Sequence, residues 1–530
     1  MSEEKATAVH YEVNSQDDAS KNVESYHIAH EVVNSEPTAF LYLLVTVASV
    51  SHFMFGYDTG YISSALVSVN NDLGEPLTYG RKEFITSATS LGALITAVFA
   101  GSIADAIGRN YACQVANAFF VIGAVTQAAA QNVWTMIVGR FIMGFGVGIA
   151  SVVSPLYITE LAPAKWRGRL VMMASIIRTG AQLASYGIGA GLVHVNKGWR
   201  ILVAISLFPT LLQAALLTRL PDTPRYLVGK NRLDEARDVM VRINGGASDK
   251  SIDAKIVELQ EATYDPTNGM SAFKKFCVKY RELHTVPSNF RGLIIVCGMQ
   301  GINQFTGFNS LMYFSATIFE MVGFKNATAV SILVAAINFI FTIAVFFFID
   351  RLGRRKLMII SLAGMVCALV LAAVAFHFMD IKFANNQAVI NTTGMTGWGI
   401  VILVAMLLYV AFFAFGTGAV PWQQSETFPM NVRGLGSSLA CAVNWSGSLI
   451  IASTFLTMME KITPTGTFAF FGAVSFISLI CVFFLYPELG HLELEETKEI
   501  LETKFDIKRS IQLSNLRKRQ TRKGYSEEEL

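Results

Sequence analysis

Charged residues are scarce in this sequence. Of its 530 residues only 15% are Asp, Glu, Lys or Arg, whereas 52% are hydrophobic. An average soluble domain carries roughly 25% charged residues. The formal net charge is +3, and no polar segment carries a basic stripe interleaved with aromatic side chains. The shortage of charge excludes an ordinary soluble domain, and the small net charge without such a stripe excludes a nucleic-acid partner.

The residue patterns of metal sites and of enzyme active sites are also missing. The six cysteines form no C-x-x-C pair, and five of them lie in apolar stretches, where a cysteine usually packs as a small hydrophobe. No cluster of His and Cys has the spacing of metal ligands, and no nucleophile elbow occurs. We therefore expect no metal, no cofactor and no enzymatic activity.

Long apolar runs, in contrast, are abundant. Twelve stretches contain about 20 or more mainly apolar residues, the length that a helix needs to cross a bilayer. They cover approximately residues 39–66, 84–107, 111–130, 136–158, 170–193, 201–220, 291–319, 327–349, 357–379, 397–425, 435–458 and 467–486. The sequence therefore predicts an all-α membrane protein with twelve transmembrane helices.

The charges of the loops predict how the chain is oriented. An even number of spans places both termini on one side, and Lys and Arg concentrate on the cytoplasmic side of a membrane. The loops of the two sides carry similar numbers of Lys and Arg, and the basic flanks of segment 221–290 give the excess to the side of the termini. We therefore expect both termini in the cytoplasm. Asn326 and Asn391 each begin an N-x-T sequon in a loop of the opposite side, and both are candidate glycosylation sites.

Polar segments divide the spans into two groups. Residues 1–38 are polar and lack the apolar region of a signal peptide, so we expect a disordered cytoplasmic tail. Residues 39–220 and 291–486 hold six spans each and predict two six-helix bundles. Apolar residues recur at helical spacing in residues 221–290, which predicts short cytoplasmic helices, and residues 487–530 form a cytoplasmic C-terminal tail.

Two polar motifs recur six spans apart and relate the bundles to each other. A D-x-x-G-R loop contains Asp105 and Arg109 in the first half, and its copy contains Asp350 and Arg354 at an offset of 245 positions. An E-x-x-P loop followed by Arg-Gly occurs after the fourth and the tenth spans. Pairing between these acids and bases predicts cytoplasmic latches that open in one state. The predicted latch residues are Asp105, Arg109, Glu160, Arg169, Asp350, Arg354, Glu426 and Arg433.

Further motifs point to a known family. F-G-Y-D-T-G lies at 55–60, P-D-T-P-R at 221–225 and Q-F-T-G-F-N at 304–309, and Pro421-Trp422 lies in the tenth span. With the repeated loops, they make the chain resemble the sugar porters of the major facilitator superfamily over roughly residues 39–496. Residues 309–324 are similar to fungal myo-inositol transporters, which are proton symporters of the plasma membrane.

The resemblance implies two pseudo-symmetric six-helix bundles that alternate around a central site, with a neutral polyol, myo-inositol above all, as the solute. The chain departs from the family pattern at three places. Asn303 replaces the first of two adjacent glutamines, Asp222 replaces a glutamate, and Pro-Glu-Leu at 487–489 replaces Pro-Glu-Thr. The last two departures put the fine geometry of the latches in doubt.

Asp58 is a carboxylate within a membrane span, which costs about 2.5–3.5 kcal/mol on insertion scales and needs a partner or a function. Arg140, in the fourth span, is the expected partner. Protonation of Asp58 breaks such a pair, so the two residues predict a proton switch, and the resemblance implies Asp here in proton-coupled members. A static ion pair that only joins two helices is the alternative.

A solute without charge needs amides as donors and acceptors, together with an aromatic face. Amides inside apolar spans match or lie at the polar sites of the family's cavity, and Trp422 is placed to stack on the ring. The predicted substrate residues are Gln182, Asn303, Gln304, Asn309, Asn338, Trp422 and Asn444. Any one amide could instead make a plain interhelical hydrogen bond.

Arg178 lies four residues before Gln182 and therefore on the same helical face. Its side chain either reaches the cytoplasmic surface or lines the inward exit path.

Two alternatives to proton symport of myo-inositol stay open. One is proton-coupled or facilitative transport of a hexose or another polyol, because hexoses and inositols present similar rings of hydroxyl groups. The other is a nutrient sensor with a transporter-like body. A sensor of that kind needs a long signalling tail, whereas 44 residues follow Tyr486, so transport is favoured.

Overall fold

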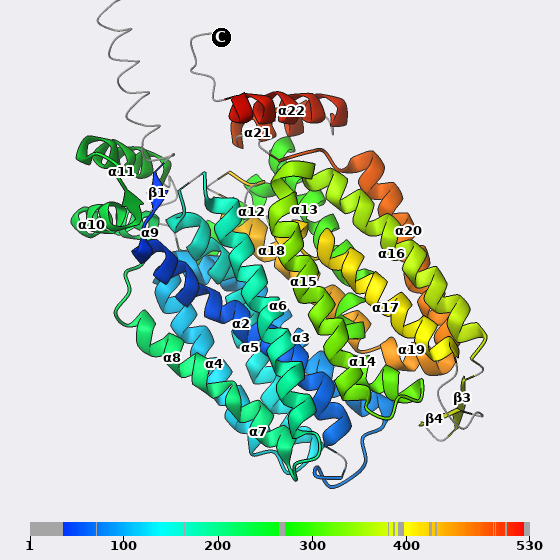
Figure 1. Ribbon diagram of the computed structural model, residues 1–530. Coiled ribbons are helices and arrows are strands. Elements are labelled where there is room, and N and C mark those ends of the chain that lie inside the picture. The colour runs from blue at the N-terminus through cyan, green and yellow to red at the C-terminus, as the bar shows by residue number, and fades with distance from the viewer. Residues whose placement is uncertain are drawn as a thin grey trace, which may run out of the picture.

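The structure is a computed structural model. It describes residues 35–69, 71–163, 165–263, 271–379, 381–384, 387–390, 397–422, 427–429, 432–490, 492, 494–503 and 506–523. Asn391, Glu426 and most of the predicted N-terminal tail lie outside these residues, as does the side chain of Asp350. The described chain is a bundle of long helices that run side by side (Figure 1).

Every predicted span corresponds to one helix or to two consecutive ones. The first half contains α2 Ala39–Ser68, α3 Tyr79–Ile107, α4 Arg109–Ala128, α5 Val133–Leu161, α6 Arg167–Leu192, α7 Gly198–Ile205 and α8 Leu207–Leu217. The second contains α13 Pro287–Phe305, α14 Phe308–Met321, α15 Ala327–Leu352, α16 Arg354–His377, α17 Gly397–Phe415, α18 Arg433–Ala452, α19 Phe455–Lys461 and α20 Thr463–Leu485.

Within the described residues, nine segments are long and apolar enough to cross a membrane by length and composition. The three predicted spans outside this set are α4, α6 and the pair α13–α14. The first two carry polar side chains such as Asn117, Arg178 and Gln182, and the third is interrupted at Gly307. Two of these three spans thus contain buried polar groups, and the third is interrupted.

One end of the bundle carries the connecting segment between the halves (Figure 1). This segment contains α9 Pro224–Gly229, α10 Leu233–Ile243, α11 Asp249–Thr263 and α12 Ala272–Thr285. We call this end the linker end. The opposite end carries a hairpin of β3 Ile381–Ala384 and β4 Gln387–Ile390, and we call it the hairpin end.

Parts of both predicted tails form secondary structure near the bundle. β1 Glu36–Pro37 pairs antiparallel with β2 Asn244–Gly245, and the hydroxyl of Ser35 donates to Asn244 at 2.8 Å. At the other terminus, α21 Leu494–Thr503 and α22 Ile507–Lys523 lie across the linker end (Figure 1). Residues 35–38, at the end of the predicted N-terminal tail, lie against the linker, because the backbone groups of β1 find partners in β2.

The two halves pack against each other along several helix pairs. α2 of the first half contacts α14, α6 contacts α15, and α3 contacts α18. Because these pairs surround the middle of the bundle, side chains from both halves face a common centre.

Candidate functional site

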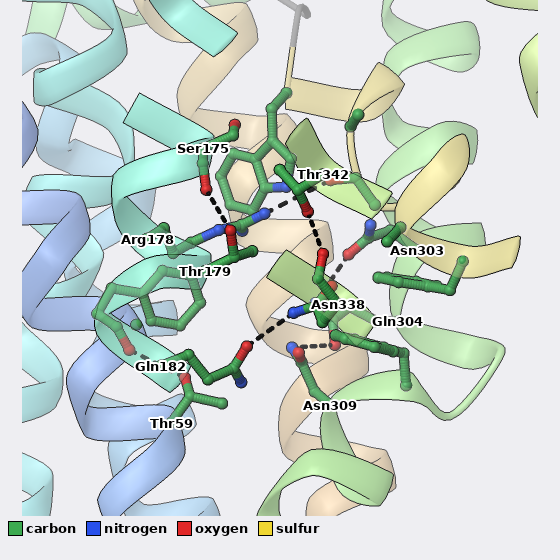
Figure 2. Close-up of a pocket in the computed structure, with 18 residues that line it drawn as sticks. Thr59, Ser175, Arg178, Thr179, Gln182, Asn303, Gln304, Asn309, Asn338 and Thr342 are labelled. Atoms are coloured by element: carbon green, nitrogen blue, oxygen red, sulfur yellow. Dashed lines mark hydrogen bonds between the residues drawn. The ribbon is translucent and has the colours of Figure 1, made fainter. Parts of the chain in front are cut away.

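A cavity lies at this centre, and side chains of both halves line it (Figure 2). Its outline holds about 550 Å³ of space that no atoms fill, which includes open solvent. Polar residues of the lining are Thr59, Ser175, Arg178, Thr179, Gln182, Asn303, Gln304, Asn309, Asn338 and Thr342, and aromatic ones are Phe55, Phe308, Phe413 and Trp422. The mixture of amides, hydroxyls and aromatic faces suits a polar solute that also has apolar C–H surface.

A break in one helix brings three of the amides together. α13 ends at Phe305, and Gly307 has a positive φ of 91°, a conformation that only glycine adopts without strain. The break lets Asn303 and Gln304 at the end of α13 face Asn309 in the first turn of α14. Interrupted spans are a recurrent way of presenting polar groups near the middle of a membrane.

The amides bind one another across the cavity. The Nδ2 atom of Asn309 donates to Gln304 Oε1 at 2.9 Å, and Gln304 Nε2 donates to Asn303 Oδ1 at 3.2 Å. The amide of Asn338 on α15 donates to Gln182 Oε1 on α6 at 2.8 Å (Figure 2). This last bond joins the first half of the molecule to the second half.

Asn444 differs from the other predicted substrate residues, because it does not belong to the lining of the cavity. It accepts from Gln304 Nε2 at 3.1 Å and donates to Gln300 Oε1 at 2.7 Å. Its amide therefore orients Gln304 from behind, which is a positioning role. Gln300, which in turn donates to the carbonyl of Pro421 at 3.1 Å, was missed by the sequence analysis.

Trp422 lines the cavity as predicted, and its indole Nε1 has no hydrogen-bond partner among the described residues. The sequence analysis missed the hydroxyl groups that stand beside the amides. Thr179 and Ser175 lie three and seven residues before Gln182, and Thr342 lies four after Asn338. These intervals place them on the same helical faces as the amides, which was the signal that could have identified them.

Arg178 lies in the wall of the cavity and not at the membrane surface (Figure 2). Its guanidinium group lies over the ring of Trp422, 5.0 Å from the ring centre, and it donates to the carbonyl oxygen of Gly418 at 3.5 Å. Of the two predicted positions, at the surface or in the lining of a path through the molecule, Arg178 takes the second.

The predicted ion pair lies beside the cavity. Arg140 Nη1 is 2.7 Å from Asp58 Oδ1, and both side chains are buried. Arg140 also donates from Nη1 to the Tyr61 hydroxyl at 3.1 Å and from Nε to the carbonyl of Ile85 at 3.2 Å, whereas its Nη2 atom has no partner among the described residues. Tyr61 donates onward to Gln127 at 2.7 Å. Loss of the charge on Asp58 would leave the arginine held by neutral acceptors only.

Contacts join the two halves between the cavity and the hairpin end. The hydroxyl groups of Ser63 and Ser315 are 3.1 Å apart, and Tyr186 donates to the carbonyl of Met312. Farther out, Glu83 accepts from the backbone N–H of Thr457 at 2.8 Å and from its hydroxyl at 2.6 Å.

Other contacts join the halves toward the linker end. The N–H of Gly101 donates to the Ser438 hydroxyl at 2.9 Å, and the indole of Trp445 donates to Ser151 Oγ at 3.1 Å. The halves therefore touch on both sides of the cavity.

The first-half latch residues form a cluster at the linker end. Arg109 Nη2 is 2.6 Å from Asp105 Oδ1 and 2.9 Å from Glu160 Oε1. Arg225 Nη1 reaches the same Glu160 oxygen at 3.3 Å. Arg169 lies with its guanidinium 5.2 Å from the ring centre of Trp166. The ion pairs of this cluster join helices of the first half to the start of the linker.

In the second half, Arg433 donates to a backbone carbonyl, and the backbone N–H groups at the start of α16 donate to a carboxylate. Arg433 Nε donates to the carbonyl of Phe428 at 3.2 Å. The backbone N–H of Arg354 donates to Glu488 Oε1 at 3.0 Å, and that of Arg355 donates to Oε2 at 3.1 Å.

Asp222 makes the matching contacts in the first half, which the sequence analysis did not predict. It accepts from the N–H groups of Arg109 and Asn110 at 3.1 and 3.2 Å, so each carboxylate caps the helix that follows a D-x-x-G-R glycine. Burial raises the pKa of the Asp222 carboxyl. The signal was present in the sequence, since an acid follows a proline after the last span of each half, as Pro221-Asp222 and Pro487-Glu488.

Asn326 is exposed in the turn between α14 and α15. This turn lies away from the linker end, as its use as a sequon requires.

Comparison with known proteins adds to this geometry. A family model described as "Sugar (and other) transporter" matches residues 44–501. The chain is 53% identical over 509 residues to myo-inositol transporter 1 of Saccharomyces cerevisiae, covering 96% of this chain and 86% of that protein. It is 49% identical to myo-inositol transporter 1 of Candida albicans, covering 92% and 88%.

Among solved structures, the chain resembles the major facilitator superfamily proton:xylose symporter XylE bound to 6-bromo-6-deoxy-D-glucose. The TM-score is 0.74 at 24% identity, and the likeness covers 88% of this chain and 100% of that one. This likeness shows the fold that the sequence predicts, two six-helix halves around a centre.

Proposed function

Because this chain belongs to the sugar (and other) transporter family, we propose that it carries myo-inositol across the plasma membrane together with a proton. Its two halves alternate in opening the cavity to either side, and both termini and the linker end face the cytoplasm. The relatives named as myo-inositol transporters support the choice of solute, and the name of the proton:xylose symporter supports a coupled proton.

One observation carries this proposal: amides of both halves line one cavity, and the halves touch on both sides of it. Gln182 of the first half and Asn338 of the second already bind each other at 2.8 Å. A ring with several hydroxyl groups offers each amide both a donor and an acceptor, so it can replace this bond with bonds of its own. Bound solute then holds the two halves together while the cavity closes to one side of the membrane and opens to the other.

The proton acts through the ion pair of Asp58 and Arg140. When Asp58 is charged, the pair fixes α2 against α5 at 2.7 Å. When it accepts a proton, the attraction is lost, and Arg140 keeps only its bonds to neutral groups such as Tyr61. Protonation therefore changes which packing of the first half is preferred, which links proton entry to reorientation of the cavity.

Uptake of labelled myo-inositol by cells that lack their own inositol transport tests the solute. We expect saturable uptake that accumulates the label, is stronger at acidic external pH, and raises the external pH as solute and proton enter together. A panel of competitors compares inositol isomers, glucose and xylose. Stronger inhibition by glucose or xylose than by the inositols would identify a sugar as the solute. The absence of any uptake would favour the alternative that the protein is a nutrient sensor.

Asp58→Asn tests the coupled proton. We expect the variant to lose accumulation and the external pH rise, because a neutral amide cannot gain or release a proton. Exchange of labelled for unlabelled solute across proteoliposomes should persist, and that measurement also shows that the variant is folded. Asp234→Asn makes the same change on an exposed face of α10 and serves as the control. Unchanged pH-dependent accumulation in Asp58→Asn would contradict the proposal.

A further inference from the structure

Arg178 is a cation in the cavity wall without an acidic partner. Among the described residues, no aspartate or glutamate lies within 4.0 Å of its guanidinium nitrogens, whereas Arg140 has Asp58 and Arg109 has Asp105. A charge taken out of water needs compensation by a partner of opposite charge or by strong hydrogen bonds. The proposed neutral solute gives no reason for a positive charge at this place.

The contacts that Arg178 does make are weak ones. Among the described residues it makes one hydrogen bond, to the carbonyl of Gly418, and this bond is 3.5 Å long. Two aromatic rings support the cation, that of Trp422 at 5.0 Å and that of Phe55 at 5.7 Å. A guanidinium group has five N–H donors, so most of its donors have no partner among the described residues. The group lies in the lining of the cavity, where those donors can meet a solute (Figure 2).

The neighbours of Arg178 fit hydroxyl groups. One helical turn away on the same face, Gln182 presents its amide to the cavity, and Thr179 adds a hydroxyl. Across the cavity, Asn338 and Thr342 present the same chemistry from α15. A solute that satisfies the whole surface has a ring of hydroxyl groups and, at one edge, an acceptor strong enough for a guanidinium.

We propose that Arg178 binds a carboxylate, so that the cavity accepts polyhydroxylated rings with an acid group, such as hexuronates, besides neutral polyols. This inference rests on the proposal that the cavity is the solute site. A carboxylate is the acceptor that an arginine fork matches with two parallel hydrogen bonds. Trp422 and Phe55 keep the guanidinium in place while the cavity is without solute.

The inference has an electrical consequence. A neutral polyol that enters with one proton moves one positive charge, whereas a monoanion that enters with one proton moves none. Solute uptake should therefore drive an inward current with myo-inositol and no current with glucuronate, although both acidify the inside of a proteoliposome.

Binding to the purified full-length protein tests the inference directly. Isothermal titration calorimetry with glucuronate is compared for the wild type, Arg178→Gln and Arg178→Lys. We expect Arg178→Gln to weaken glucuronate binding roughly ten- to a hundredfold, because this is the effect of losing a hydrogen bond to a charged group. Its binding of myo-inositol should change much less. Arg178→Lys should restore part of the affinity, because the charge remains and the fork is lost.

The control variant is Lys250→Gln, which removes one positive charge from an exposed face of α11 and should leave both affinities as they are. Inositol monophosphate is a second probe. If its binding also depends on Arg178, the arginine binds phosphate groups as well as carboxylates. If glucuronate does not bind the wild type, or if Arg178→Gln weakens myo-inositol and glucuronate equally, Arg178 only joins the two halves and the inference fails. Binding of glucuronate without any uptake of myo-inositol would instead overturn the proposed solute.

Discussion

Gln304 shows how single residues organise the solute site. Its amide binds Asn303, Asn309 and Asn444 at once, at 3.2, 2.9 and 3.1 Å. These three bonds fix which side of the amide is the donor and which is the acceptor. The sequence identified these amides as a set because each lies within an apolar span. It could not tell that Asn444 stands behind the others, since that depends on how α18 is rotated about its axis.

Asn444→Ala tests this positioning role. The variant leaves Gln304 without one acceptor, so we expect the dissociation constant for myo-inositol to rise roughly fivefold, in line with the loss of one neutral hydrogen bond. Gln304→Ala should weaken binding more, because it removes an amide that lines the cavity itself. Titration calorimetry on both variants measures the difference, with Ser453→Ala at the exposed end of α18 as the control. A larger effect from Asn444 than from Gln304 would place Asn444 in direct contact with the solute.

Helices that follow the two D-x-x-G-R loops are capped in the same way. Gly108 and Gly353, 245 positions apart, have φ of 97° and 86°, and a side chain at either would collide with the capping carboxylate. The repeated glycine is therefore required by both the turn and the cap. The sequence predicted the repeat correctly. It missed the caps, because the carboxylates come from distant positions in the chain.

Asp222→Ala tests the cap of α4. Three backbone donors, those of Arg109, Asn110 and Thr223, lose their acceptor, and we expect a loss of about 1–2 kcal/mol in the free energy of unfolding. Asp222→Glu should retain most of the stability, since Glu488 performs the same task in the second half. Thermal unfolding in detergent compares the two variants. Equal melting temperatures for Asp222→Ala and the wild type would show that water replaces the cap.

At the scale of the whole molecule, the two halves are joined on both sides of the cavity. The contacts at the hairpin end, such as that between Ser63 and Ser315, must break before solute can enter from that side. Those at the linker end, such as that between Gly101 and Ser438, must break before it can leave. Transport requires that the two sets open in turn.

A disulfide across the hairpin end tests this requirement. The hydroxyls of Ser63 and Ser315 are 3.1 Å apart, so cysteines at these positions come within reach of a bond. We expect an oxidant to stop uptake by Ser63→Cys/Ser315→Cys and a reductant to restore it. The two single variants and the wild type, whose six cysteines are unpaired, control for other oxidation. Full uptake in the oxidised, cross-linked protein would show that this end stays closed during transport.

The sequence by itself determined the class of fold and the family. Apolar runs, a repeat at 245 positions and motif spacing are local properties. The structure and the comparisons confirm the all-α major facilitator fold and the family, and nine of the twelve predicted spans are long and apolar enough to cross a membrane among the described residues. It also predicted that Asp58 and Arg140 pair, because a charge in a membrane span needs an opposite charge nearby.

Only the tertiary structure decided which side chains meet. It placed Arg178 in the cavity wall instead of at the surface, put Asn444 behind Gln304, and brought Asp222 and Glu488 to the helices that they cap. Spacing along the chain indicates the face of a helix on which a residue lies. Which neighbour that face meets depends on the rotation and packing of separate helices, and those follow from all contacts of the bundle together.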